Sequence, residues 1–191
     1  MTSVLHSRGC LITLSYMKTT LLIIVLVAMV ALCPKFVNAQ SGVSAGVRQH
    51  VLHSVFEELP FEDGDLTYTL GYEYHDKNGY WQLLVGYTPD LSNEELGIDD
   101  IAVDYVITPQ LNLIFQDGVF LAGTGILGSY IETEEEGDWT DIYWQLMLGL
   151  EIPLGALSLE AMAYYPFESW GDIDDFDFDD VEYGGSIKYR F

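Results

Sequence analysis

The chain has 191 residues, a net charge of −23 and two cysteines. Its 30 acidic and 7 basic residues argue against binding of nucleic acid or anionic lipid through a basic patch, and they favour contact with cations. Both cysteines lie within the first 33 residues, so the rest of the chain must be held by strand pairing and packing instead of disulfides.

The first 39 residues are typical of an export signal. Met17 and Lys18 open a short basic segment, and residues 21–32 form an apolar run that is too short for an ordinary spanning helix. Small or short residues at 37–39 then offer a cleavage site. We expect residues 1–39 to be a removed signal peptide with an upstream extension, translation starting at Met1 or at Met17. Residues 40–191 form one domain with 30 acidic and 4 basic residues, a net charge of −26.

The domain is predicted to consist of strands from end to end. Most candidate segments alternate apolar and polar residues with period two, as Leu66, Tyr68 and Leu70 alternate with Thr67 and Thr69. Strands of about 10 residues suit a tilted membrane crossing. Residues 43–56 could alternatively form an amphipathic helix. The eight candidate strands are 42–52, 65–75, 79–88, 98–108, 118–131, 140–153, 156–165 and 181–191.

The predicted connections alternate in length. Residues 76–79 and 153–155 are tight turns, whereas 57–65, 89–97, 132–139 and 166–180 are longer and acidic. This alternation is typical of barrels with short periplasmic turns and long outer loops. Region 108–118 carries two turn signals. A single turn with an apolar excursion, or a bulged fifth strand starting at Leu111, would keep the number of strands even.

The apolar face of these strands can point inward, as in a soluble lipocalin-like barrel, or outward, as in a membrane barrel. The opposite faces are rich in Gly, Thr, Ser and Gln, unlike the Lys- and Glu-rich surface of a soluble sheet, which favours the membrane barrel. Aromatic residues also gather near the strand ends, as in two interfacial girdles. We expect Tyr68, Tyr87, Tyr130, Trp144, Tyr165 and Tyr183 at the outer ends, and Tyr74, Trp81, Tyr105, Tyr189 and Phe191 at the periplasmic ends. A soluble periplasmic carrier is the alternative.

The C-terminal strand carries a resemblance to a known group of proteins. Ile187, Tyr189 and Phe191 share one face, and a strand ending in an aromatic carboxylate resembles the closing strand of bacterial outer-membrane barrels. The hairpin pattern of residues 66–87, the loop alternation and the size resemble the small outer-membrane proteins of the OmpX/Ail type. The resemblance implies an all-β fold, a closed eight-stranded antiparallel up-and-down transmembrane barrel in a Gram-negative outer membrane. It implies outer-membrane lipid and the barrel-assembly machinery as partners, with Tyr189 and Phe191 as the assembly signal. We expect a monomer that binds no nucleic acid.

Charged residues on the inward faces form a predicted cluster inside the barrel. An eight-stranded barrel is just filled by side chains, and charges buried there must be paired. We therefore expect a structural plug, with Glu160 and Lys188 as close neighbours near the periplasmic end. The predicted lumen residues are Arg48, Glu73, Asp104, Glu151, Glu160, Glu182, Lys188 and Arg190.

The fourth predicted loop carries carboxylates that could bind a cation. Carboxylate oxygens suit calcium or magnesium, but Asp180 and Ser186 stand where an EF-hand needs Gly and Glu. A solvated acidic loop explains the pattern equally. The candidate ligands of weak calcium or magnesium binding are Asp172, Asp174, Asp175, Asp177, Asp179 and Asp180. No other cofactor is expected.

These features together predict a structural, envelope or surface-interaction role instead of catalysis. A lipid-A-modifying enzyme is the alternative, because His53 and Ser54 lie near an outer strand end. No third residue that would orient them is identifiable, and the chain has no zinc motif, phosphate loop or nucleophile elbow.

Overall fold

The computed structural model describes residues 40–51, 61, 63–91, 103–133, 137–171, 173 and 176–191. The chain separates into two units, 1–38 and 39–191, and the described residues all belong to the second unit. The predicted signal peptide, residues 1–39, lies outside them. The described part of the chain contains no helix that is long and apolar enough to cross a membrane.

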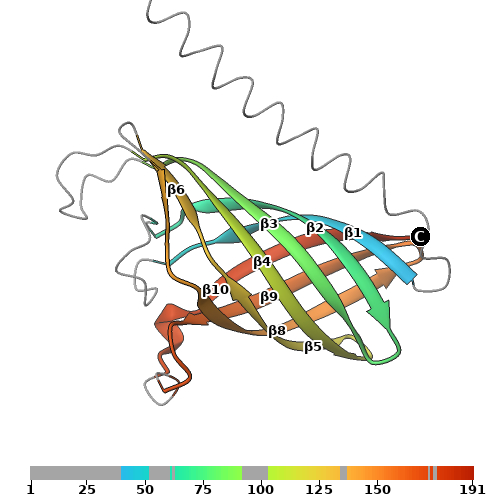
Figure 1. Cartoon of the computed structure of the whole chain (residues 1–191). Coiled ribbons are helices and arrows are strands. Elements are labelled where there is room, and N and C mark those ends of the chain that lie inside the picture. Colours follow the sequence, from blue (N-terminus) through green and yellow to red (C-terminus); the bar gives the residue numbers. More distant parts are fainter. Residues whose placement is uncertain are drawn as a thin grey trace, which may run out of the picture. The chain divides into compact units, whose positions relative to one another are not determined.

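Antiparallel strands pair side by side until the last one closes on the first (Figure 1). β1 pairs with β2 on one side and with β10 on the other, and β3 pairs with β4, which completes the ring. β6 continues β5 beyond a two-residue break, and β7, which pairs with β6, lies at the loop-side end of β8. The ten elements therefore build eight barrel strands, which we call staves. They are β1 (Gln40–Gln49), β2 (Leu66–Asp76), β3 (Gly79–Leu91), β4 (Val103–Asp117), β5 (Phe120–Leu127), β6 (Tyr130–Thr133), β7 (Gly137–Trp139), β8 (Tyr143–Leu154), β9 (Leu157–Phe167) and β10 (Glu182–Arg190).

One end of the barrel carries only short turns. Residues 77–78, 118–119 and 155–156 connect strands there, and Gly118 (φ 62°) and Gly155 (φ 78°) adopt the left-handed conformation that glycine tolerates best. We call this the turn end, and the opposite end, which carries the longer connections, the loop end. The predicted turn at 76–79 is confirmed, whereas the turn predicted at 153–155 lies slightly later, at 155–156, because Pro153 and Leu154 still belong to β8. The segment 40–49 is a strand, so the alternative helix over 43–56 is wrong for these residues.

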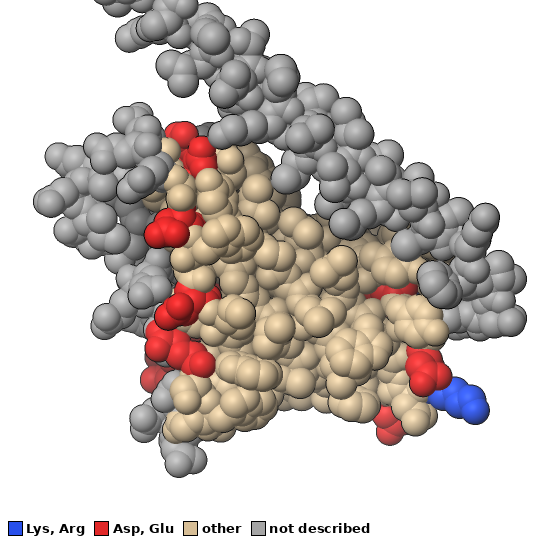
Figure 2. Space-filling model, viewed as in Figure 1, with Lys and Arg blue, Asp and Glu red and all other residues tan. Residues whose placement is uncertain are grey.

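Side chains alternate between an apolar outer face and a polar inner face. On β2, Leu66 and Leu70 are exposed, whereas Thr67 and Glu73 are buried inside. The exposed side of β8 carries Leu148, with 67% of its surface accessible. Figure 2 shows a wide belt without charged side chains, with Asp and Glu gathered mainly at the loop end on the left. Hydrocarbon is the solvent that such a belt requires, and a closed ring leaves no unpaired strand edge. The fold is therefore a closed, eight-stranded, antiparallel, up-and-down transmembrane β-barrel.

The fourth strand differs from the prediction. It runs unbroken from Val103 to Asp117, so the predicted strand 98–108 ends too early and the turn falls at 118–119. Pro109, which suggested a turn, sits opposite the break between β5 and β6, where its carbonyl accepts a bond from Gly128 N at 3.4 Å. A residue's N–H and C=O point to the same side of a strand, so the donor that proline lacks also falls at this break. Tyr105 consequently lies at the loop end, beside Tyr87, and not at the periplasmic end as predicted.

The interior also contains two apolar clusters. Tyr80, Ile114, Leu121, Met147 and Met162 pack together, and Phe61, Val103, Val106, Leu127 and Tyr143 form a second cluster. The lumen is thus filled by packed side chains as well as by the polar network described below, as expected for eight staves.

Candidate functional site

A buried lysine organises the turn end of the lumen. Lys188 is 0% exposed, and its Nζ lies 2.9 Å from Glu73 Oε1, 2.5 Å from Glu160 Oε2 and 3.5 Å from Glu151 Oε2. It also donates a hydrogen bond to the Tyr80 hydroxyl at 2.5 Å, and that hydroxyl donates to Glu160 at 2.8 Å. We call these five residues the lysine cluster. Each stands at an inward position of its strand, so five staves are joined around one ammonium group.

Further polar groups complete the lysine cluster. Arg190 forms an ion pair with Glu151, and His75 Nε2 lies 2.9 Å from Glu73 Oε2. Ser186 donates a hydrogen bond to Glu160 Oε1 at 3.1 Å. A buried carboxylate is costly unless its charge and lone pairs are matched. Here each of the three glutamates has a basic partner, so the cluster stabilises the closed barrel.

A second cluster occupies the loop end. Arg48 pairs with Glu182, donates to Gln145 Oε1 at 3.0 Å and lies over the Tyr164 ring at 4.3 Å. His50 Nδ1 lies 2.9 Å from Glu182 Oε1. We call these five residues the arginine cluster. It brings β1, β8, β9 and β10 together with the residue that follows β1.

Side-chain amides connect the two clusters through the middle of the barrel. Gln145 Nε2 donates to Asn112 Oδ1 at 2.8 Å, Asn112 Nδ2 donates to Gln82 Oε1 at 3.0 Å, and Gln82 Nε2 donates to Glu73 Oε1 at 3.0 Å. Gln145 also receives the bond from Arg48 and donates to Gln110 Oε1 at 3.0 Å. These amides are at most 4% exposed. The result is one hydrogen-bonded chain that crosses the lumen from Glu182 at the loop end to Lys188 at the turn end.

The structure brings seven of the eight predicted lumen residues into ion pairs. They are Arg48, Glu73, Glu151, Glu160, Glu182, Lys188 and Arg190. The prediction that Asp104 lies in the lumen is wrong, because this residue is exposed at the loop end. A bulge between Val103 and Tyr105 shifts the register, so Val103 turns inward in place of Asp104.

The amide chain was not predicted from sequence. Gln82, Asn112 and Gln145 occupy inward positions of β3, β4 and β8, so their parity alone could have marked them as lumen residues. Gly125 also belongs to this arrangement, since a side chain there would collide with Asn112 Oδ1. No sequence signal indicates which amides meet, because their strands are far apart in the chain.

One hydrogen-bonded series resembles a nucleophile with its base. Thr67 Oγ1 lies 2.6 Å from His50 Nε2, and His50 Nδ1 contacts Glu182. A carboxylate only accepts, so Nδ1 carries the proton and Nε2 can accept from the threonine. However, Thr67 is 2% exposed, its Oγ1 also contacts Thr88 Oγ1 at 2.6 Å, and Phe61 stacks on His50 at 3.7 Å. The Thr67 hydroxyl is therefore buried among the described residues, and the series joins β2, β3 and β10 at the loop end. The predicted pair His53 and Ser54 lies outside the described residues.

The predicted cation ligands are only partly described. Asp172, Asp174 and Asp175 lie outside the described residues. Asp177 Oδ1 accepts a hydrogen bond from Asp179 N at 3.1 Å and so caps the short 3-10 helix Phe178–Asp180, labelled η2. Within the part of the chain that the structure describes, no three His, Cys, Asp or Glu side chains are arranged to hold a metal ion.

The C-terminal residues occupy the outer face of the turn end. Tyr189 is 48% and Phe191 62% exposed, and their rings stack at 6.2 Å. The backbone N–H of Phe191 donates to Ser41 O at 2.9 Å. The last residue is therefore bound to the first strand and adds its ring to the outward aromatic side chains.

Comparison with known proteins finds no relative by sequence, and the solved structures given below align only at low similarity. No family model matches the chain, and no curated protein matches its sequence. Among solved structures, Ail, the attachment invasion locus protein of Yersinia pestis, aligns at 16% identity with a TM-score of 0.41, over 80% of this chain and 99% of Ail. Neisserial surface protein A aligns at 11% identity with a TM-score of 0.39, over 80% of this chain and 96% of that protein. The resemblance to the OmpX/Ail type in fold rests on this chain's own closed ring of eight staves.

Proposed function

We propose that this protein is a bacterial outer-membrane barrel that acts through its exterior and its acidic loops, in envelope structure or surface contact. The observation that carries the proposal is the apolar belt around an interior that holds the lysine and arginine clusters. The turn end then faces the periplasm and the loop end faces outward, the usual orientation of such barrels.

The outer face supports membrane insertion over the lipocalin-like alternative. Leu148 and Phe120 are each 67% exposed and Ile152 is 57% exposed, on neighbouring staves. Water tolerates contiguous apolar patches of this kind poorly, and a soluble carrier would turn the same side chains inward around its ligand. Instead Lys188, Glu73 and Glu151 occupy the inside.

The interior supports a role that involves neither transport nor catalysis. The hydrogen-bonded chain from Glu182 to Lys188 crosses the lumen, and the apolar clusters fill the space beside it. Reconstituted protein should therefore give no stable single-channel conductance. The loops remain as the parts that can meet other molecules.

The charge of the loop end supports contact mediated by cations. Figure 2 shows acidic side chains gathered there, and the sequence adds Glu134, Glu135 and Glu136 of the third loop and the aspartates of the fourth. Calcium or magnesium bound weakly by these carboxylates would screen their repulsion and could bridge them to anionic groups on a neighbouring surface. Asp172, Asp174, Asp175, Asp177, Asp179 and Asp180 are the proposed ligands.

The test is localisation combined with folding state. We expect the protein in the outer-membrane fraction, with a band that shifts on heating before gel electrophoresis. Protease added to whole cells should cut only in the loops. Recovery in the soluble periplasmic fraction, with no heat-dependent shift, would overturn the proposal. Unchanged lipid A masses with and without the protein would exclude the enzyme alternative.

A further inference from the structure

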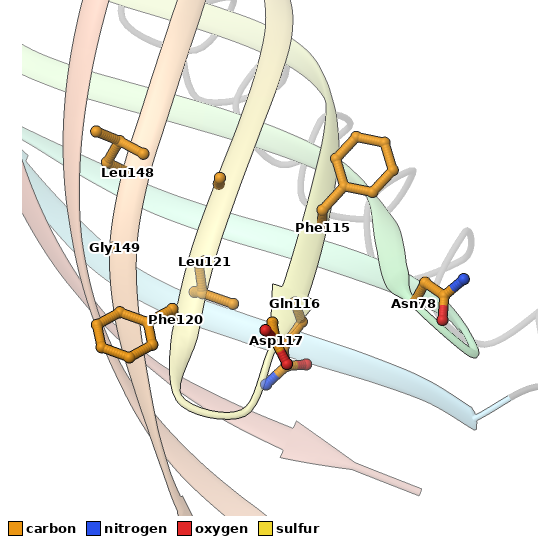
Figure 3. Close-up of a pocket in the computed structure, with 9 residues that line it drawn as sticks. Asn78, Phe115, Gln116, Asp117, Phe120, Leu121, Leu148 and Gly149 are labelled. Atoms are coloured by element: carbon orange, nitrogen blue, oxygen red, sulfur yellow. The ribbon is translucent and has the colours of Figure 1, made fainter.

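A groove runs along the outer face of β5 at the turn end. Ala122 points outward from β5, with Phe115 of β4 directly opposite on one side and Leu148 of β8 on the other. One step further from the turn, Thr124 stands between Leu113 and Leu146 in the same way. A row of small side chains is thus flanked by two rows of large ones. Figure 3 shows Phe115, Phe120 and Leu148 around the turn end of this groove.

The groove is apolar along its length. Phe115 is 57% exposed, Phe120 67% and Leu148 67%, so rings and branched chains form its sides. The hydroxyl of Thr124 is already satisfied, because it donates to the carbonyl of Gln145 at 3.1 Å. Beyond the turn, the described outward side chains of the groove therefore offer hydrocarbon no unpaired polar group, and this stretch lies within the belt that faces lipid.

Polar side chains and charged side chains of both signs lie where the groove meets the turns. Asn78, Gln116 and Asp117 line this end. Gln116 N donates to Asn78 O at 3.0 Å, which holds the turn at 77–78 beside the end of β4. Lys77, next to Asn78, is the one exposed lysine or arginine among the described residues, since Arg48 and Lys188 are buried and Arg190 is half-buried. Neither Lys77 nor Asp117 forms an ion pair with a described residue, so both charges remain available to a ligand.

We propose that this groove holds one acyl chain of a phospholipid with an ethanolamine head group, taken from the leaflet at the turn end. Phe115, Ala122, Thr124 and Leu148 contact the chain. The Lys77 ammonium group pairs with the lipid phosphate, and the Asp117 carboxylate accepts a hydrogen bond from the ammonium group of the ethanolamine. Phosphatidylglycerol would leave Asp117 beside an anionic lipid, and the choline head group offers it no N–H donor. The inference rests on the proposed function, since it needs the barrel to be in a membrane.

The test uses the full folded barrel in vesicles that contain equal amounts of phosphatidylethanolamine, phosphatidylglycerol and phosphatidylcholine with identical acyl chains. Insertion is checked first by the heat-dependent gel shift, and lipid that remains bound after gentle release is then identified by native mass spectrometry. We expect phosphatidylethanolamine to be retained about two- to fivefold over the other two, the range that an exposed charge pair can supply.

Three variants make the assignment specific. Ala122→Phe fills the groove and should abolish retention, whereas Ala161→Phe, at another exposed outward alanine, on β9, should leave it unchanged. Asp117→Asn should remove the preference for ethanolamine while keeping bound lipid. Three outcomes would overturn the proposed lipid site but not the proposed function: insertion without retained lipid, retention without preference, and equal retention in the two phenylalanine variants. Failure to insert would overturn the proposed function itself.

Discussion

Lys188 and Glu160 lie on adjacent strands two residues out of direct register, and their side chains meet at 2.5 Å inside the barrel. Glu160 is paired directly with Ser186, so the lysine reaches its carboxylate diagonally. β10 also forms the closing seam with β1. A slip of one residue would turn Lys188 toward lipid, so this ion pair helps to fix the register of closure as well as the stability.

Removing the lysine should be costly. Lys188→Met leaves three buried carboxylates with less compensation, and we expect the free energy of unfolding to fall by about 3–5 kcal/mol. Adding Glu160→Gln should recover only part of this loss, because Glu73 and Glu151 still lack their ion pairs with Lys188. Urea unfolding of the refolded barrel measures Lys188→Met, Glu160→Gln and the double variant. Strictly additive losses would mean that Lys188 and Glu160 do not interact.

A methyl group at Gly125 should disturb the amide chain. Its Cβ would collide with Asn112 Oδ1, and moving that amide breaks its bonds to Gln82 and Gln145. We expect Gly125→Ala to lower the free energy of unfolding by about 1–3 kcal/mol, the cost of unsatisfied buried groups.

Gly185→Ala is the matched control for Gly125→Ala. Gly185 faces outward, and its nearest neighbour would be Glu160 O at an ordinary 3.6 Å. This substitution should be neutral or slightly stabilising, because alanine loses less backbone freedom on folding. Equal effects of the two substitutions in the same urea titration would mean that the amide chain does not contribute to the free energy of unfolding.

Deletion of Phe191 should impair assembly. The residue adds an exposed ring next to Tyr189 and a backbone bond to Ser41, and it ends the strand that closes the barrel. We expect less of the heat-shifted, folded form in the outer membrane at normal expression. Phe191→Trp should restore it, since it keeps an aromatic terminus. Full yield after the deletion would count against an assembly role.

Calcium should protect the fourth loop from proteolysis. Six aspartates fall between residues 172 and 180, and their repulsion should keep the loop open when no divalent ion is present. About millimolar calcium should slow cleavage within residues 167–180 more than sodium does at the same ionic strength.

The combined substitutions Asp172→Asn, Asp174→Asn and Asp175→Asn should remove this effect of calcium while leaving the η2 cap at Asp177 in place. Identical cleavage in calcium and in chelator would leave a merely solvated acidic loop.

The sequence alone determined the parts of this barrel that repeat locally. Period-two alternation predicted that Leu66 and Leu70 share one face and Thr67 and Glu73 the other. The tight turn at 76–79 was correctly placed, and the one predicted at 153–155 lies at 155–156. These features depend only on the geometry of one strand or one turn, so neighbouring residues encode them.

Tertiary structure decided the rest. The extent of β4 through Pro109 depends on a break in its partner stave, and the bulge that expels Asp104 exists only where β4 meets β6. The meeting of Gln145 with Asn112 depends on register across strands that are 33 residues apart in the chain. The alternation along each strand decides which side chains point into the lumen. Their partners are decided by closure of the barrel, because only then do inward side chains from distant strands lie in one space.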